Sequence, residues 1–492
     1  MPDRYPEWRR PVSEGRRIAA NSFWLGLAFG GSKFFTIILN AIAGRVLGPA
    51  GFGLLGIASA LAEVGKLVSG AGLDFLVARE VASEPARAPR LSHDVALIKL
   101  LNAAGVYILL ALLVATLDYP PVLLPLVLIL GSALFIENLS DLLDAVFQGL
   151  QRMRVTTVAF LVSGLVLLGT GSAALLSGLG LRAYAMCFVI GFLVRFVVMF
   201  IAARRAGLIE LGWRGIDRVE SRRLVLASLP LLASTGLALI FHRMDLLMLG
   251  TLETTAAVGL YTAAVRVIDS VVLVPRVLGT ALYPALRKSL QEDPVRARAL
   301  LTESSRITLT VCSGIAVLVW VLAPWALSVT PGPEFVAAAD VLRLLSFGIV
   351  LQGLAHVVAR LLLAIDAERD FLGAVSVALV LNFALNLYLI PRYGILGAAW
   401  ATLLANGVSG SLYLLAAWRR GHALAWRAGI GGPLLALAVG AAVSVPVDWP
   451  LPAGLRLVLA WALVLVLSGG LRLTDLSRLV DLLRRRPSGT SQ

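Results

Sequence analysis

Apolar runs of about 20 residues alternate with short polar breaks along nearly the whole chain. Roughly 20 apolar residues at about 1.5 Å each cross the hydrocarbon core of a bilayer, so each run predicts one transmembrane helix. The pattern therefore predicts an all-α polytopic membrane protein of about 14 transmembrane helices. We place these spans at residues 18–43, 52–76, 95–117, 121–148, 156–178, 182–203, 224–250, 256–285, 307–328, 335–364, 371–391, 395–418, 427–446 and 453–470.

The composition agrees with a membrane protein and excludes other classes. Of 492 residues, 59% are hydrophobic and only 15% are charged. A soluble domain carries about 25% charged residues, and a disordered chain needs low hydrophobicity and high charge. The two cysteines, Cys187 and Cys312, lie in apolar runs and indicate neither a disulfide framework nor a metal site. We expect no metal and no cofactor.

The net charge of +14 is distributed in a pattern that predicts topology. Arginines concentrate in alternate breaks, and the breaks between these hold almost none. This is the positive-inside pattern, which predicts that both termini are cytoplasmic. Nucleic acid is not expected as a partner, because no basic cluster sits on a soluble module.

An internal repeat predicts two lobes. The stretch at 178–185 is similar to 394–401, and Phe52-Gly53-Leu54 is similar to Val258-Gly259-Leu260. Six-span units repeated in parallel give a pseudo-two-fold axis along the membrane normal and a central cavity between the lobes. Chance similarity between Gly- and Ala-rich helices is the alternative. The predicted organisation is a cytoplasmic segment 1–17, an N-lobe 18–205, a linker 206–223, a C-lobe 224–420, spans 13 and 14 within 421–470, and a cytoplasmic amphipathic tail 471–492.

Several short motifs resemble one family of transporters. They are Arg45-Val-Leu-Gly-Pro-Ala-Gly-Phe-Gly53, Phe147-Gln-Gly-Leu-Gln-Arg-Met-Arg154, Arg243-Met-Asp245 and Ala281-Leu-Tyr-Pro284. With these motifs in this order, the chain resembles polysaccharide flippases of the Wzx type. These flippases belong to the multidrug/oligosaccharidyl-lipid/polysaccharide (MOP) exporter superfamily. The resemblance implies a transporter and not an enzyme. This transporter would move an isoprenoid-diphosphate-linked oligosaccharide to the outer leaflet of the bacterial inner membrane by alternating access. It also implies membrane lipids, a polysaccharide polymerase and glycosyltransferases as partners.

Ionisable residues inside the spans are the candidate site. Each costs at least roughly 2.5–3.5 kcal/mol on insertion scales, so it needs a partner or a wet cavity. A cationic cleft would suit a diphosphate, which arginine can bind with two hydrogen bonds. The expected diphosphate or cavity residues are Lys33, Lys66, Arg243, Arg266 and Arg276, with Arg45 at the outer end of span 1. Structural pairing of Lys66 with Glu63, of Arg243 with Asp245 and of Arg266 with Asp269 is the open alternative.

Span 4 carries an acidic face. Spacings of four, three and four residues place Glu137, Asp141, Asp144 and Gln148 on one side of a helix. These carboxylates could bind a coupling H⁺ or Na⁺, or they could neutralise Lys99 and Arg195 in neighbouring spans. We favour neutralisation. Membrane potential is a second possible driving force, because outward movement of a dianion releases about 2.3 kcal/mol per charge per 100 mV.

Three other functions compete with the flippase hypothesis. A MATE-like ion-coupled drug antiporter would need an acidic, aromatic cavity to bind cationic ligands. Spans 1, 2, 7 and 8 instead carry surplus cations. A polytopic glycan-processing enzyme would need a sizeable outer loop with acid and base residues, and the outer breaks are short. A membrane scaffold would not need unpaired cations in its spans.

Overall fold

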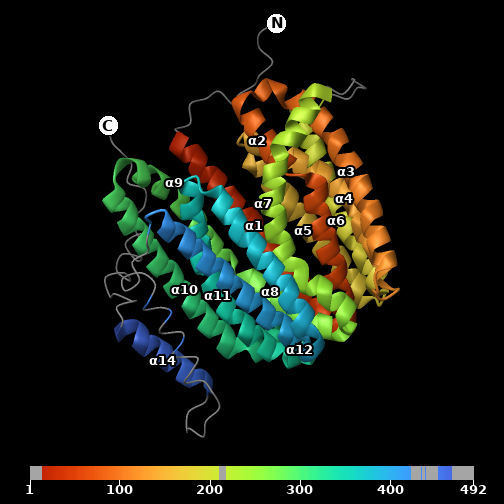
Figure 1. Ribbon diagram of the computed structural model, residues 1–492. Coiled ribbons are helices and arrows are strands. Elements are labelled where there is room, and N and C mark those ends of the chain that lie inside the picture. The colour runs from red at the N-terminus through yellow and green to blue at the C-terminus, as the bar shows by residue number, and fades with distance from the viewer. Residues whose placement is uncertain are drawn as a thin grey trace. The chain divides into compact units, whose positions relative to one another are not determined.

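The computed structural model describes residues 14–209, 218–422 and 453–467, together with residues 431, 434 and 438. Within these ranges the regular elements are all helices, and no strand occurs (Figure 1). The predicted all-α class is confirmed. The first elements are α1 (Glu14–Gly70), α2 (Leu73–Ser83), η1 (Pro85–Arg87), α3 (Ala88–Thr116), α4 (Leu123–Gly149), α5 (Met153–Leu176), α6 (Gly180–Arg205) and α7 (Arg218–Leu252). They are followed by α8 (Thr255–Val271), α9 (Leu273–Glu292), α10 (Pro294–Val329), η2 (Pro333–Ala338), α11 (Ala339–Ala364), α12 (Glu368–Arg419) and α14 (Ala453–Leu467).

Two helices are long enough to cross a bilayer twice. Helix α1 has 57 residues and α12 has 52, or about 85 Å and 78 Å of helix against a hydrocarbon core of about 30 Å. Each is bent at one non-helical glycine, Gly48 (φ 63°, ψ −177°) and Gly394 (φ 56°, ψ −135°). A positive φ is accessible to glycine at little steric cost. Each long helix therefore contains the two spans that the sequence predicts there.

The described part of the chain holds ten helices that are long and apolar enough to span a membrane, with α1 and α12 among them. Counting those two as double gives twelve of the predicted spans. Predicted span 14 corresponds to α14, whereas span 13 and the amphipathic tail 471–492 fall outside the described residues, apart from three single positions. Two predicted spans are divided in the structure. Span 2 ends at Gly70, and residues 73–76 belong to the separate helix α2, while span 8 (256–285) is split between α8, which ends at Val271, and α9, which begins at Leu273.

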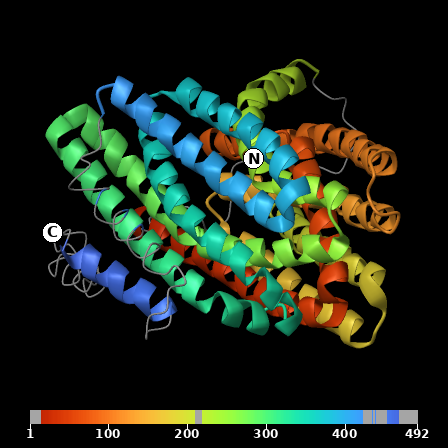
Figure 2. The same ribbon diagram turned by 60° about the horizontal axis from the view of Figure 1, so that its bottom comes forward.

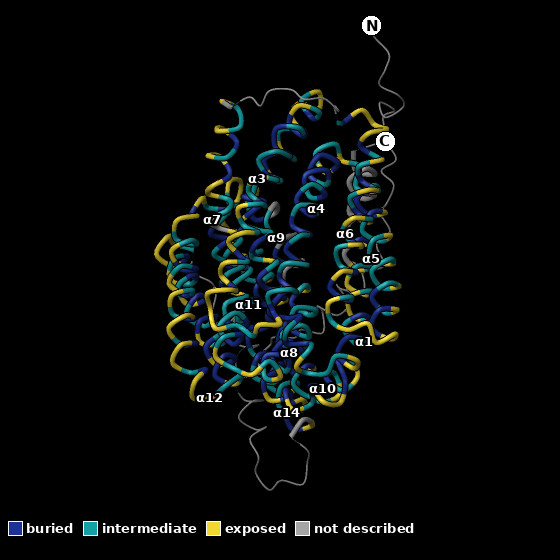
Figure 3. Tube along the Cα trace, turned by 90° about the vertical axis from the view of Figure 1, so that its right-hand side faces the viewer, coloured by how far each residue is buried: buried dark blue, intermediate teal, exposed yellow. Residues whose placement is uncertain are grey.

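Exposed positions recur along the helices (Figure 3), and many of them carry large apolar side chains. Leu101 is 70% exposed, Leu165 61% and Val380 68%. Apolar exposure on this scale is not expected of a protein surrounded by water. It is expected of helices that face lipid, so the surface supports a multi-span membrane protein.

Two compact units make up the chain. The first unit is Met1–Thr262 with Val329–Glu334, and the second is Ala263–Ser328 with Phe335–Gln492. In the first unit α4 packs against α1, α3 and α6, and in the second α11 packs along α12 (Figure 2). Helix α7 packs with α1 and α2, so the first unit extends beyond the predicted linker 206–223. The predicted lobes, 18–205 and 224–420, follow from the sequence repeat, and their limits remain a prediction.

Within the first unit, the repeat-related glycines Gly53 and Gly259 lie against each other. A Cβ atom on Gly53 would lie 2.8 Å from the backbone nitrogen of Gly259, and a Cβ on Gly259 would lie 2.7 Å from the carbonyl carbon of Pro49. The backbones of α1 and α8 therefore touch directly at this point. Small residues allow membrane helices to approach this closely. Contact between Gly53 and Gly259 is also what the predicted repeat would give near its two-fold axis.

We predict that Gly259→Ala destabilises the protein, because the added methyl group has no space and overpacking costs about 2 kcal/mol. The measurement is the melting temperature of the detergent-purified protein, followed by size-exclusion chromatography after heating. Gly105→Ala is the matched control, since a Cβ there meets nothing within 4 Å. Equal melting temperatures for the two variants would show that α1 and α8 are not in direct backbone contact.

Candidate functional site

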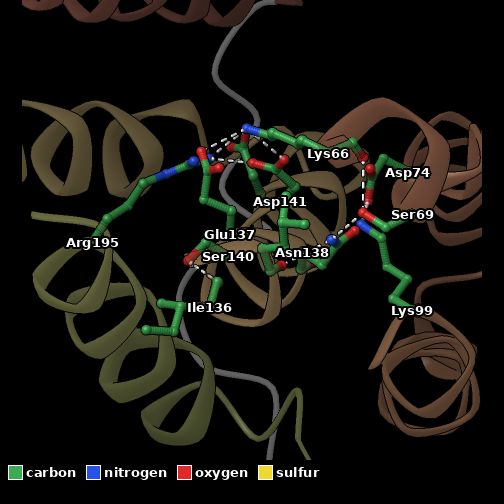
Figure 4. Close-up of polar contacts among 12 residues, drawn as sticks. Lys66, Ser69, Asp74, Lys99, Ile136, Glu137, Asn138, Ser140, Asp141 and Arg195 are labelled. Atoms are coloured by element: carbon green, nitrogen blue, oxygen red, sulfur yellow. Dashed lines mark hydrogen bonds and ion pairs between the residues drawn. The ribbon is translucent and has the colours of Figure 1, made fainter. Parts of the chain in front are cut away.

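Lys66 is the centre of a charged network inside the first unit (Figure 4). It lies near the end of α1, and its Nζ atom is 3.0 Å from Glu137 Oε1 and 3.0 Å from Asp141 Oδ2, both on α4. The spacing of four residues puts these two carboxylates on one face of α4, as the sequence predicts. The predicted alternative of a Glu63–Lys66 pair is wrong, because Lys66 contacts the acidic face of the neighbouring helix instead.

Arg195 extends the network to α6. Its Nη2 atom lies 2.9 Å from Asp141 Oδ1 and 3.7 Å from Asp144 Oδ2. The Arg195 side chain is only 4% exposed, and its guanidinium group lies 4.1 Å from the centre of the Phe160 ring. Asp144 also accepts hydrogen bonds from Thr156 Oγ1 (2.6 Å) and Gln148 Nε2 (3.1 Å). The acidic face of α4 thus lies against Arg195, the neutralising arrangement that we favour from the sequence.

Lys99 joins α3 and α2 to the same region. This side chain is fully buried, and its Nζ atom donates to Asp74 Oδ1 (2.5 Å) and to the Asn138 carbonyl oxygen (3.0 Å). Asn138 Nδ2 donates in turn to Ser69 Oγ at 2.7 Å. The sequence predicts that the carboxylates of α4 neutralise Lys99. The ion pair is instead with Asp74, which the sequence analysis missed.

With every group ionised, the described network would carry one excess negative charge. It contains the four carboxylates Asp74, Glu137, Asp141 and Asp144, but only the three cations Lys66, Lys99 and Arg195. Among the described residues, no group of three or more His, Cys, Asp or Glu side chains is arranged to hold a metal ion. The carboxylates are oriented toward ammonium and guanidinium groups. Lys66 and its surroundings therefore do not provide the excess positive charge expected from the sequence.

A second polar contact joins α1 to α7. Arg243 Nε lies 2.7 Å from Glu63 Oε2, and the two side chains are 20% and 47% exposed. Asp245 is buried and accepts a hydrogen bond from Tyr261 Oη at 2.8 Å. The sequence suggests Asp245 as a partner for Arg243. In the structure, the guanidinium group of Arg243 contacts the carboxylate of Glu63, which lies on another helix.

The remaining candidates are on α1, α8 and α9. Lys33 is exposed on α1, and Arg45 donates from Nη2 to the Val329 carbonyl oxygen at 2.9 Å, close to the turn that precedes η2. Arg266 and Asp269 are partly exposed on α8, in the second unit. Arg276 lies on α9, and its side chain is outside the described residues.

Residues that sequence reasoning missed complete the network. Ser69, Asp74 and Thr156 each bond to one of its members. Ser69 lies three residues after Lys66, which is a helical spacing and a usable signal. Asp74 gave no such signal, because the chain bends between α1 and α2 and removes the helical register.

Comparison with known sequences identifies a family. A sequence model of the polysaccharide biosynthesis protein family matches residues 18–290, which is more than half of the chain. The probable low-salt glycan biosynthesis flippase Agl15 of Haloferax volcanii is 26% identical over 171 residues, covering 35% of this chain and 36% of the relative. The probable flippase AglR of the same organism is 30% identical over 170 residues, covering 33% and 35%. The chain thus matches about a third of the length of these curated relatives.

Comparison with solved structures gives the same fold. The lipid II flippase MurJ, in an inward closed conformation, has a TM-score of 0.68 at 14% identity and covers 92% of this chain and 99% of its own. An inward-facing multidrug resistance MATE family transporter of the MOP superfamily has a TM-score of 0.67 at 15% identity, covering 79% and 94%. The chain has the fold of these transporters, and it belongs to the polysaccharide biosynthesis protein family.

Proposed function

We propose that this protein is a flippase that moves an isoprenoid-diphosphate-linked oligosaccharide from the cytoplasmic to the outer leaflet of the bacterial inner membrane. The observation that carries the proposal is the family match over residues 18–290, in a fold shared with a lipid II flippase. Charged groups within the spans fit this task, because the diphosphate and hydroxyls of such a substrate must stay hydrated or bonded while they cross. Both termini are cytoplasmic in this proposal, as the basic breaks predict.

Transport by alternating access requires a place for the diphosphate, and we propose Arg243 for its first contact. Arg243 lies on α7, is partly exposed and already binds a carboxylate, that of Glu63. A guanidinium group binds carboxylate and phosphate with the same planar fork. Glu63 therefore acts as an internal anion that the diphosphate displaces. Lys33, Lys66, Arg266, Arg276 and Arg45 stay candidates for later contacts along the path.

For the coupling ion, the α4 network favours H⁺ over Na⁺. Four carboxylates share three cations, so one proton would make the network neutral, and an uncompensated buried charge is costly. The groups that face the α4 carboxylates are Lys66 on α1, Lys99 on α3, Arg195 on α6 and Thr156 on α5, with Asp74 on α2 paired to Lys99. A sodium ion would need several converging oxygen ligands, and the described carboxylates are oriented toward cations instead.

A MATE-like antiporter of small cationic molecules is the second candidate function, because a MATE transporter shares the fold. The family match favours the flippase. A polysaccharide polymerase and glycosyltransferases are the partners that a surface-glycan pathway would supply.

We predict that Arg243→Gln lowers flipping at least tenfold. The assay reconstitutes purified protein in vesicles that contain a lipid-linked oligosaccharide, and follows the sugar that becomes accessible to an added glycosidase. Arg392→Gln is the matched control, since Arg392 is exposed and donates to the Tyr388 carbonyl oxygen of its own helix. Full activity of Arg243→Gln would remove Arg243 from the substrate path, and export of cationic dyes without any flipping would favour the antiporter.

We predict the opposite effect for Glu63→Gln. The amide removes the negative charge that competes for Arg243, so half-saturation should occur at a several-fold lower substrate concentration. The same vesicle assay over a range of substrate concentrations measures this. A higher half-saturation concentration would show that Glu63 assists binding and does not compete with the diphosphate.

We predict that Glu137→Gln abolishes the acceleration of flipping by an imposed proton gradient, because the neutral amide removes the excess negative charge. The measurement compares flipping with and without a transmembrane pH difference at zero membrane potential. Glu292→Gln, at a 61% exposed side chain on α9, is the control. Equal acceleration in Glu137→Gln and wild type would contradict a proton site, and acceleration by potential alone would identify membrane potential as the driving force.

A further inference from the structure

A closed ring of four charged side chains ties α2 and η1 to the first two turns of α7. Arg87 donates from Nη1 to Glu80 Oε2 (2.9 Å) and from Nη2 to Glu220 Oε1 (2.6 Å). Arg223 donates from Nη2 to Glu220 Oε1 (2.7 Å) and to Glu80 Oε1 (3.2 Å). Two arginines thus bridge two glutamates, and each glutamate accepts from both. The ring is electrically neutral and joins segments that are about 130 residues apart in the sequence.

The other end of α2 is a backbone break. Helix α1 ends at Gly70, and the next two residues have positive φ angles, 50° at Ala71 and 71° at Gly72. A positive φ at alanine costs about 1–3 kcal/mol, so Ala71 stores strain at this point. Helix α2 is therefore a separate eleven-residue segment that is joined to α1 by a bend and not by a continuous helix.

Gly72 also fixes where α2 meets α7. A Cβ on Gly72 would lie 3.2 Å from Leu231 Cβ and 3.3 Å from the Ser228 carbonyl oxygen. Gly72 thus lies beside 228–231 of α7, while Glu80 lies beside Arg223. The two helices therefore run antiparallel, with a close backbone contact at one end and the ring at the other, about 12 Å away for eight residues of helix.

We propose that the ring of Glu80, Arg87, Glu220 and Arg223 is a latch that holds the first two turns of α7 against α2, and that this end of α7 opens by bending at Pro230. Helix α2 stays in place, because Leu73, Val77 and Val81 are buried against α4. The ring lies in two of the basic breaks, so it lies on the cytoplasmic side in the proposed topology. Opening would widen the cytoplasmic approach to Glu63 and Arg243 on α1 and α7. Only this consequence for transport rests on the proposed function.

The latch responds to salt and not to pH near neutrality. Burial opposes ionisation of Glu220, but hydrogen bonds from Arg223 and Arg87 outweigh it and hold the pKa of Glu220 below its ordinary value of 4.5. The ionised form is thus favoured in the closed state, and its contribution is lost only as the pH falls through that lowered pKa. The Arg223 side chain, by contrast, is 53% exposed, so dissolved ions can screen the attraction between the charges of the ring.

The test measures the distance between spin labels at Ala82→Cys and Arg222→Cys, both exposed, in a chain carrying Cys187→Ala and Cys312→Ala. We expect one short distance in the parent chain. Glu220→Gln or Arg87→Gln should increase the population at longer distances about threefold or more, and so should high salt in the parent. A change from about pH 8 to pH 6 should have no effect.

Two further variants make the outcome decisive. Reversal of all four charges (Glu80→Arg, Arg87→Glu, Glu220→Arg, Arg223→Glu) restores the attractions within the ring. Combined with Glu84→Gln, which removes the carboxylate 3.9 Å from Arg87, it should restore the short distance. Arg420→Gln breaks a comparable ion pair with Asp370 on α12 and should change nothing. Unchanged spin-label distances in Glu220→Gln would overturn the latch. The latch would also be overturned if the reversed ring had the same population at longer distances as the single variants. The distance measurement needs no substrate, so its result does not depend on whether the protein flips a lipid-linked oligosaccharide.

Discussion

A charge inside a membrane-spanning bundle must be compensated by the protein, because lipid offers neither water nor counter-ions. In the first unit this constraint is met on α4, whose carboxylates bind Lys66 of α1 and Arg195 of α6, while the Asn138 carbonyl oxygen accepts from Lys99 of α3. Apolar packing alone distinguishes poorly between neighbouring membrane helices, since lipid chains are as apolar as leucine. The ion pairs fix the rotation of α4 against α1 and α6, and the hydrogen bond from Lys99 adds α3.

The sequence predicts the helices of this fold well because the bilayer imposes a length on each apolar run. The break at Gly48-Pro49 could be located for the same reason, as an interruption between two runs. Continuity of α1 across that break could not be predicted, since it depends on two dihedral angles of one glycine. The separate helix α2 was also missed, because residues 73–76 continue the apolar run of span 2 and the bend at Ala71 has no hydropathy signal.

Charged positions within the spans were predictable, but their partners were not. Spacing along one helix correctly places Glu137, Asp141 and Asp144 on a common face. The same reasoning offers local pairing of Glu63 with Lys66 as an alternative, and this is wrong, because each finds its partner on another helix. Sequence spacing describes neighbours within one helix, whereas long side chains reach across helix contacts that only the fold defines. For this reason the sequence suggests a cationic site, and the structure shows around Lys66 a network with one carboxylate in excess.

Helix α2 links the two charged features of the first unit. Asp74 in its first turn pairs with Lys99 of the network, and Glu80, six residues later, belongs to the ring with Arg87, Glu220 and Arg223. Because Leu73, Val77 and Val81 are buried against α4, α2 is fixed to the helix that carries the network. The ring is therefore built on the same support as the network, and in the proposed latch the start of α7 is the part that can leave it. Opening of the ring separates α7 from α2 without breaking the Asp74–Lys99 pair.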